Sequence, residues 1–291
     1  MKLLICIIIF LAQFLIIKNA CADIYYFNKN SKIIGKSQVY KVENGESLIE
    51  IARKFNLGYN EIVAANPDID PFLPPIGAIV KIPTTWILPE VALYDGIVIN
   101  LSEMRLYYFY RLGSREFVKT FPIGIGREGY ETPVGQFKIV QKLENPSWYV
   151  PASIRAEKPE LPSVVPPGPD NPLGTHALRL SLNTYLIHGT NKPWGVGRRV
   201  SHGCIRLYPE DIPVLFGLVK KGVRVEIVRQ PIKIGIKDNR VFIEVHEDDL
   251  DTHFNDASAL IAKKNLLPLI DSNKLYRALL KKSGEPIDIS N

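Results

Sequence analysis

The chain has 291 residues, with 36 Lys and Arg against 30 Asp and Glu, and a formal net charge of +6. This mild basicity suits a carboxylate-bearing partner or an anionic surface. We predict no nucleic-acid partner. Beyond the first segment, no stretch is apolar enough to span a bilayer as a helix. The length allows one large domain or two small ones.

Residues 1–22 have the pattern of a signal peptide. A basic residue, Lys2, precedes an apolar run over residues 3–17, and residues 20–22, "ACA", form a small-residue cleavage pattern. The run is short for a membrane span, which needs about 20 apolar residues. We therefore predict cleavage after Ala22 and export of the mature chain.

The chain has three cysteines, and cleavage would leave a single thiol. Cys6 and Cys21 lie in the predicted leader, so the exported protein would hold only Cys204. An unpaired thiol in an oxidising compartment indicates either an inert buried side chain or a reactive group. Acylation of Cys21, as in a lipoprotein, is the alternative for the leader, although Lys18 and Asn19 do not fit that pattern.

Residues 38–85 predict a small unit of two helices between two short strands. "ESLIEIARKFN" has apolar residues at helical spacing, with Ser47 as N-cap and Glu50 three residues later. The unit resembles a LysM module, whose family binds N-acetylglucosamine-containing glycans, chiefly peptidoglycan. The alternative is a unit that only packs on the next domain. The resemblance rests on Val42, Gly45, Glu46, Ser47, Leu48, Asn66, Pro67, Ile82 and Pro83.

Residues 96–229 predict a mainly β, sandwich-like domain. "GIVINL", "MRLYYFY", "EFVKTFPI" and "GQFKIVQK" are β-branched and aromatic runs separated by turn residues. Residues 124–129 match the nucleotide-binding pattern G-x-G-x-x-G, but another strand follows them where a helix is required. We interpret this segment as a turn.

Two further segments lie before and after the residues around Cys204. Residues 145–172 are rich in proline and lack periodicity, and Trp148 and Tyr149 favour a wall or lid over a cleft. Residues 230–291 are predicted to be an accessory α/β extension, with a hairpin turning at Asp238-Asn239 and a helix from Ala257 to Lys282.

The surroundings of Cys204 suggest nucleophilic chemistry. A thiol becomes reactive when an imidazole accepts its proton and an acceptor behind the ring fixes the tautomer. His188 and His202 are both candidates, and the two-residue spacing of His202 favours it if the segment is extended. Gly203 would let a substrate approach backbone amides that stabilise an oxyanion, and Arg206 would pair with a substrate carboxylate.

Two alternatives stay open at this point. Cys204 is an inert core residue in one of them. In the other, zinc is bound by ligand types that the chain supplies, although structural zinc spacings and a metalloprotease helix are absent from the sequence. The zinc ligands would be His176, His188, His202 and Cys204.

"IHGTN", a gap and "SHGCIRL" resemble the signature of the L,D-transpeptidase catalytic domain, the YkuD-like family. "FPIGIG" and "TPVGQFKI" are also similar, so the likeness covers about residues 96–229. The resemblance implies that Cys204 is the nucleophile, His188 the general base and His202 accessory. It further implies that the Gly189 carbonyl orients His188 and that backbone amides near Gly203 form the oxyanion hole. The positions that fill the signature are His188, Ser201, His202, Gly203, Cys204, Ile205 and Arg206. We expect Ser201 and Arg206 to contact substrate.

The resemblance also implies an activity. Cys204 would form an acyl-enzyme with a peptidoglycan stem tetrapeptide, release D-alanine and transfer the acyl group to an amine. The amine would come from a second stem peptide, giving a 3-3 cross-link, or from the lysine of a Braun-type lipoprotein. Water as acceptor would give an L,D-carboxypeptidase, and an inert Cys204 would give a wall-binding protein. The resemblance implies no metal or organic cofactor, and the layout is most similar to a periplasmic Gram-negative subgroup.

Overall fold

The computed structural model describes residues 24–28, 31–182, 184–248 and 252–291. The predicted signal peptide, with Cys6, Cys21 and the cleavage point after Ala22, lies outside the described residues. Within these ranges, no helix is both long enough and apolar enough to cross a membrane.

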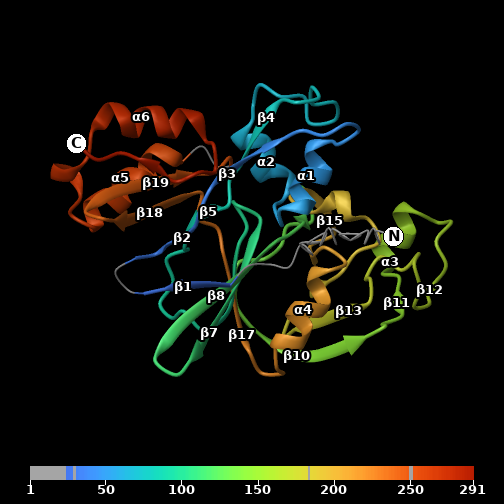
Figure 1. The fold of residues 1–291 in the computed structure, drawn as a ribbon. Helices are drawn as coiled ribbons and strands as arrows, with labels where there is room; N and C mark the ends of the chain where they lie inside the picture. The colour runs from blue at the N-terminus through green and yellow to red at the C-terminus, as the bar shows by residue number, and fades with distance from the viewer. Residues whose placement is uncertain (1–23, 29–30, 183, 249–251) are drawn as a thin grey trace, which may run out of the picture.

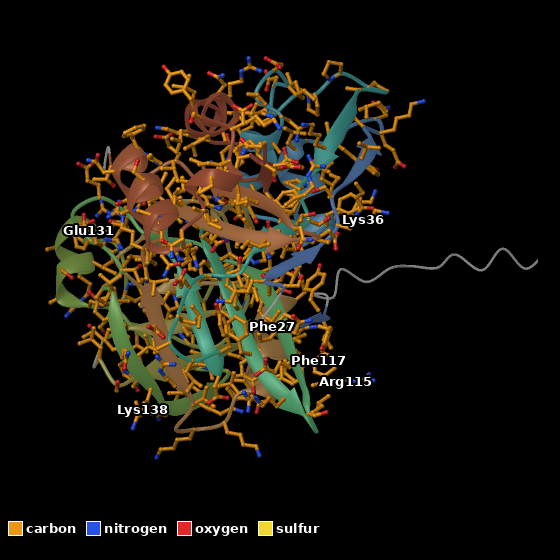
Figure 2. All side chains as sticks on the ribbon, turned by 90° about the vertical axis from the view of Figure 1, so that its left-hand side faces the viewer. Phe27, Lys36, Arg115, Phe117, Glu131 and Lys138 are labelled. Carbon is orange, nitrogen blue, oxygen red and sulfur yellow. The ribbon has the colours of Figure 1, made fainter. Side chains whose placement is uncertain are left out.

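A nine-stranded sheet forms the centre of the molecule (Figure 1), in the order β1-β8-β7-β6-β17-β10-β13-β14-β16. At one edge β1 pairs with β8, and Figure 2 labels Phe27 and Phe117 on these two strands. The strands are β1 (Ile24–Phe27), β6 (Gly96–Asn100), β7 (Arg105–Leu112), β8 (Arg115–Pro122), β10 (Gly135–Glu144), β13 (His176–Leu180), β14 (Leu186–His188), β16 (Ile205–Arg206) and β17 (Arg224–Val228).

The sheet folds over itself at β10. The first residues of β10 pair with β17 and the later ones with β13, and the register shifts between Ile139 and Gln141. Such an irregularity bends a strand, so the two parts of the sheet face each other. Helix α4 (Asp211–Leu218) covers one end of the core between them. The architecture is therefore mainly β and sandwich-like, as predicted. The core contains Ile97, Ile99, Leu106, Phe121, Leu178, Ile187, Ile205, Ile212 and Leu215.

The predicted two-helix unit is present. Helices α1 (Leu48–Lys54) and α2 (Tyr59–Ala65) lie between strands β3 (Gln38–Lys41) and β4 (Ile79–Ile82), which pair with each other. The predicted capping box is also confirmed: the Glu50 N–H donates to Ser47 Oγ, and the Ser47 N–H donates to the Glu50 carboxylate at 2.7 Å.

This unit packs directly on the large sheet. Its apolar residues share one core with Val98, Tyr107, Phe109 and Val118 of the sheet. The contact also buries an ion pair, in which Arg105 Nη2 lies 2.7 Å from Glu61 Oε2 with the Arg105 side chain 0% exposed. Removing one partner of a buried pair strongly destabilises the folded protein, because it leaves a buried charge without its counter-charge. The unit and the sheet are therefore held in a defined arrangement.

The C-terminal segment forms a small α/β layer beside the two-helix unit (Figure 1). The hairpin of β18 (Ile232–Lys237) and β19 (Arg240–Val245) turns at Asp238 and Asn239, as predicted, both with positive φ. The prediction of one helix over 257–282 is wrong. The chain instead forms α5 (His253–Lys263) and α6 (Ser272–Lys281), separated at Asn265, which has a φ of 53°.

The remaining elements are short. They are β2 (Ile33–Gly35), β5 (Thr85–Ile87), β9 (Ile125–Gly126), β11 (Trp148–Tyr149), α3 (Ala152–Glu157), β12 (Val164–Val165), η1 (Pro193–Gly195), β15 (Arg199–Ser201), η2 (Leu267–Leu269) and β20 (Ile287–Asp288). Residues 124–129 contain strand β9 followed by a turn, which confirms that this glycine-rich segment does not open a helix.

Candidate active site

The site is built on one face of three neighbouring strands. In the register, Ala177 of β13 lies opposite His188 of β14, and His188 lies opposite Arg206 of β16. Side chains alternate along a strand, so these three residues share one face, while Ile187 and Ile205 point into the core. Ala177 is fully buried.

Cys204 lies immediately before β16. Continuation of the register places it opposite Leu186, and alternation puts its side chain on the same face as that of Arg206. The thiol packs with Leu173, Ala177 and Leu186 in a small apolar cluster. The pairing of β14 with β16 thus brings Cys204 near His188 although sixteen residues separate them in the chain.

Both side chains open into one cavity of about 430 Å³. The segment over residues 145–172 forms a wall of this cavity, which confirms that prediction, and lies at the right of Figure 1 as β11, α3 and β12. The cavity is lined by Tyr130, Leu143, Ser147, Trp148, Tyr149, Pro151, Ser153, Ile154, Pro172, Leu173, Arg179, Thr184, Tyr185, Leu186, His188, Ser201, His202, Cys204 and Arg206.

The ring of His188 is oriented by its neighbour. Nδ1 lies 2.6 Å from the Gly189 carbonyl oxygen, and because a carbonyl only accepts, the proton is assigned to Nδ1. Nε2 is then the basic nitrogen. Burial and then the charge of Arg206 lower the pKa of His188 to about 3, against the opposite effect of the Gly189 and Leu173 carbonyls. At neutral pH the ring is therefore uncharged and able to accept a proton.

The thiol is also uncharged at rest. Burial raises the pKa of the Cys204 thiol, while the Leu186 N–H and the charges of Arg206 and Arg179 act to lower it. Its sulfur lies 3.7 Å from the Thr184 carbonyl oxygen. Both groups are therefore neutral at rest, so formation of a thiolate requires removal of the thiol proton.

Ser201 and Gly203 shape the turn that precedes Cys204. Ser201 Oγ donates to the Cys204 carbonyl at 2.6 Å and accepts from the Gly203 N–H at 3.0 Å. Gly203 has a φ of 101°, and a Cβ there would lie 2.7 Å from the Tyr185 ring. Ser201, expected to contact substrate, lines the cavity but uses its hydroxyl within the turn.

His202 is engaged away from the thiol. Its Nε2 lies 3.2 Å from Glu157 and 3.1 Å from Arg127, and its ring packs on Tyr130 with centroids 4.7 Å apart. The extended segment on which the spacing argument depended is absent, because the chain bends at His202 and Gly203. The two-residue spacing therefore does not make His202 the partner of Cys204, although His202 lines the cavity.

Sequence reasoning missed three residues of the site. Arg179 of β13 lines the cavity, and Glu157 connects α3 to Arg127 and His202. Thr132 Oγ1 donates to the Gly203 carbonyl at 2.9 Å and accepts from a backbone amide of the glycine-rich turn. Thr132 stands in "TPVGQFKI", so that motif was the available signal for it, whereas Glu157 carries no motif.

The four residues considered for zinc do not form a cluster among the residues that the structure describes. There, the one group with metal-ligand geometry is Glu103, Glu244 and His246. Lys233 Nζ lies 2.7 Å from both of these carboxylates, so an ammonium already neutralises the group. It is a buried ion network between the sheet and the C-terminal layer.

Comparison with known proteins gives the following matches. Residues 94–227 match the YkuD family, described as the L,D-transpeptidase catalytic domain, and residues 40–83 match the LysM domain. The chain is 38% identical over 276 residues to "Probable L,D-transpeptidase YcfS" of Escherichia coli K12, covering 89% of this chain and 85% of the relative.

Two further relatives are similar over the same extent. "Probable L,D-transpeptidase YbiS" of E. coli K12 is 38% identical over 277 residues, 89% of each chain. "Probable L,D-transpeptidase ErfK/SrfK" of Salmonella typhimurium is 37% identical over 282 residues, 90% of this chain and 89% of the relative. The similarity therefore extends well beyond the motif around the cysteine.

Proposed function

The chain belongs to the YkuD-type L,D-transpeptidase family, and on that premise we propose that it is a peptidoglycan L,D-transpeptidase working through a cysteine acyl-enzyme. The observation that carries the proposal is that His188, at the end of β14, and Cys204, immediately before the neighbouring β16, face one cavity. The 2.6 Å contact of His188 Nδ1 with the Gly189 carbonyl supports His188 as the base.

In the first half-reaction, Cys204 Sγ attacks the carbonyl at the L-centre of the diamino acid in position three of a stem tetrapeptide. The S–H proton passes to His188 Nε2 as the S–C bond forms. When the intermediate collapses, the C–N bond breaks and His188 returns the proton to the leaving D-alanine. The product is a thioester on Cys204.

In the second half-reaction, an amine attacks the thioester carbonyl. His188 takes the proton from the amine, and the thiol is regenerated when the S–C bond breaks and the proton returns to sulfur. An amine of a second stem peptide gives a 3-3 cross-link, and the C-terminal lysine of a Braun-type lipoprotein gives protein attachment. Water gives carboxypeptidase activity.

Other residues have supporting roles in the proposal. A charged Arg206 opposite His188 disfavours imidazolium at rest and faces the cavity, where it would pair with a substrate carboxylate. Backbone amides near Gly203 would serve the oxyanion. Because the Gly203 N–H is bonded to Ser201 Oγ at rest, its use requires that bond to yield as charge develops.

We further propose that residues 38–85 bind peptidoglycan glycan, that residues 96–229 catalyse and that residues 230–291 are accessory, in a periplasmic protein. Pelleting of the full chain with purified sacculi, with and without excess N-acetylglucosamine oligomers, tests the glycan role. Competition by the oligomers without loss of turnover on soluble tetrapeptide is expected, and unaltered pelleting contradicts glycan binding.

The activity itself is tested by D-alanine release from tetrapeptide muropeptides. The wild-type chain is expected to release D-alanine, and Cys204→Ala to release none while still pelleting with sacculi. Retained release by Cys204→Ala would overturn the proposed mechanism. Muropeptide mass spectrometry with an added amine or lipoprotein peptide then identifies the acceptor.

A further inference from the structure

The cavity has an unusual charge composition. Among the described residues that line it are Arg179 and Arg206, and none of them is Asp or Glu. Cationic groups in a concave site with apolar walls attract anionic ligands more strongly than the same groups on an open surface. The composition therefore favours a ligand with more than one carboxylate.

The two arginines stand at different distances from the chemistry. Arg206 lies opposite His188, beside the reacting atoms. Arg179 lies opposite Leu186, and Cys204 follows on the next strand, so two strand spacings separate Arg179 from the nucleophile. That is roughly 10 Å between backbones, since neighbouring strands lie about 4.8 Å apart.

Arg179 nevertheless lines the same cavity, and a hydrogen bond orients its side chain. Its Nε–H donates to Gln141 Oε1, 3.1 Å away on β10, which fixes one edge of the planar guanidinium. Its charge also acts to lower the pKa of the Cys204 thiol, so the guanidinium lies within electrostatic range of that group. Its position suits an anionic group several bonds away from the atom that sulfur attacks.

The proposed donor carries such a group. The diamino acid attacked at its L-centre has a second centre, at the far end of its side chain, with its own carboxylate. When the L-centre carbonyl is at Cys204, this carboxylate is separated from the scissile bond by the length of the side chain. A guanidinium pairs with a carboxylate in a directional, charge-assisted manner.

We propose that Arg179 is a specificity residue that binds the second-centre carboxylate of the acyl donor. The inference rests on the proposed function and extends it to the form of the diamino acid that the protein accepts. Arg179 takes no part in bond breaking, so its contribution lies in donor binding. A donor in which this carboxylate is amidated lacks the charged partner.

The test measures D-alanine release from two soluble tetrapeptides that differ only in a free or amidated second-centre carboxylate. We expect wild-type protein to prefer the free carboxylate. Arg179→Gln should lower kcat/KM for that donor by roughly 10- to 100-fold, mainly through KM, which is the size of a charged hydrogen bond. The amidated donor should be unaffected, and Arg179→Lys should recover part of the loss.

Arg155→Gln, an exposed change on α3 outside the cavity lining, is the matched control and should behave as wild type. Equal use of both donors by wild-type protein, or an equal loss on both in Arg179→Gln, overturns the inference while leaving the transpeptidase proposal intact. Failure of wild-type protein to release D-alanine from either donor refutes the proposed function itself.

Discussion

The backbone N–H of Tyr59 donates to the carbonyl of Val196, with 3.2 Å between nitrogen and oxygen. This bond joins α2 of the LysM-type unit to the loop that runs from His188 to Cys204. Beside it, the Arg198 guanidinium lies 3.7 Å from the centre of the Tyr59 ring. The unit therefore contacts the loop that leads to Cys204, in addition to any role in glycan binding.

Gly197→Ala should disturb this support. Gly197 has a φ of 77°, and a Cβ would lie 2.1 Å from the Tyr59 nitrogen and 2.6 Å from the Gly58 carbonyl carbon. We expect a loss of roughly 1–3 kcal/mol in the free energy of unfolding, from strain and overpacking together. D-alanine release should fall at temperatures where the variant is still folded. Urea denaturation and turnover measure the two effects.

Gly217→Ala is the matched control for that change. A Cβ at Gly217 would have no atom within 4 Å, and the residue lies inside α4. Alanine favours a helix over glycine by about 1 kcal/mol, so the control should be neutral or more stable. Equal behaviour of the two variants would show that the contact with Tyr59 does not constrain the loop.

Burial of neutral His188 should make stability depend on pH. The folded pKa of about 3 lies below the ordinary 6.5, so the unfolded chain binds more protons between these values. This contribution is complete above pH 6.5 and is lost as pH falls toward 3. His188→Gln removes it. The free energy of unfolding of wild type minus that of His188→Gln should therefore fall by up to about 2 kcal/mol from pH 7 to pH 5.

Wild type must be compared with His188→Gln because Asp211 changes the stability of the protein with pH in the opposite direction. Burial and then Glu210 raise the pKa of Asp211 to about 7, so its contribution is lost as pH rises from 3.8. The two slopes oppose each other in the wild-type curve but Asp211 is common to both proteins. A difference that stays constant from pH 7 to pH 5 contradicts a neutral buried His188.

The neutral resting pair also predicts the reactivity of the thiol. Only thiolate reacts with iodoacetamide, and burial raises the pKa of Cys204. The alkylation rate in the absence of substrate should rise about tenfold from pH 7 to pH 8, without a plateau below neutral pH. Peptide mapping confirms the labelled residue. Fast alkylation that is independent of pH between 5 and 7 would instead indicate a thiolate–imidazolium pair.

Glu157 should hold the end of α3 in its place in the wall of the cavity. It ends α3, accepts from Arg127 at 2.8 Å and lies 3.2 Å from His202. Glu157→Gln weakens both interactions without removing buried apolar area. We expect KM for tetrapeptide to rise several-fold with little change in the melting temperature. Glu160→Gln in the same loop is the control, and unchanged KM in Glu157→Gln would exclude a role for this contact.

Some of this organisation was predictable from the sequence, because it depends on local patterns. The capping box of Ser47 and Glu50, the turn at Asp238 and Asn239, and the absence of a helix after the glycine-rich turn all follow from neighbouring residues. The break at Asn265 was missed because the apolar periodicity continues on both sides of it.

The geometry of the site was less accessible. The two-residue spacing favoured His202, since residues i and i+2 of a strand lie on the same face. The bend at His202 and Gly203 instead directs the His202 side chain away from the thiol. The roles of Arg179 and Leu186 depend on strand register, which pairs residues that are distant in sequence and carry no motif. The resemblance to the family, rather than periodicity, indicated His188.

The proposed function depends on transfer of the acyl group of a stem peptide to Cys204. Intact-protein mass spectrometry after mixing with tetrapeptide donor, quenched in acid before an amine is added, detects this acyl-enzyme. We predict an adduct equal in mass to the donor less D-alanine, mapped to Cys204, reduced in His188→Ala and absent in Cys204→Ser. D-alanine release at the wild-type rate by Cys204→Ser, with no adduct at any time in either protein, would show that Cys204 is not acylated.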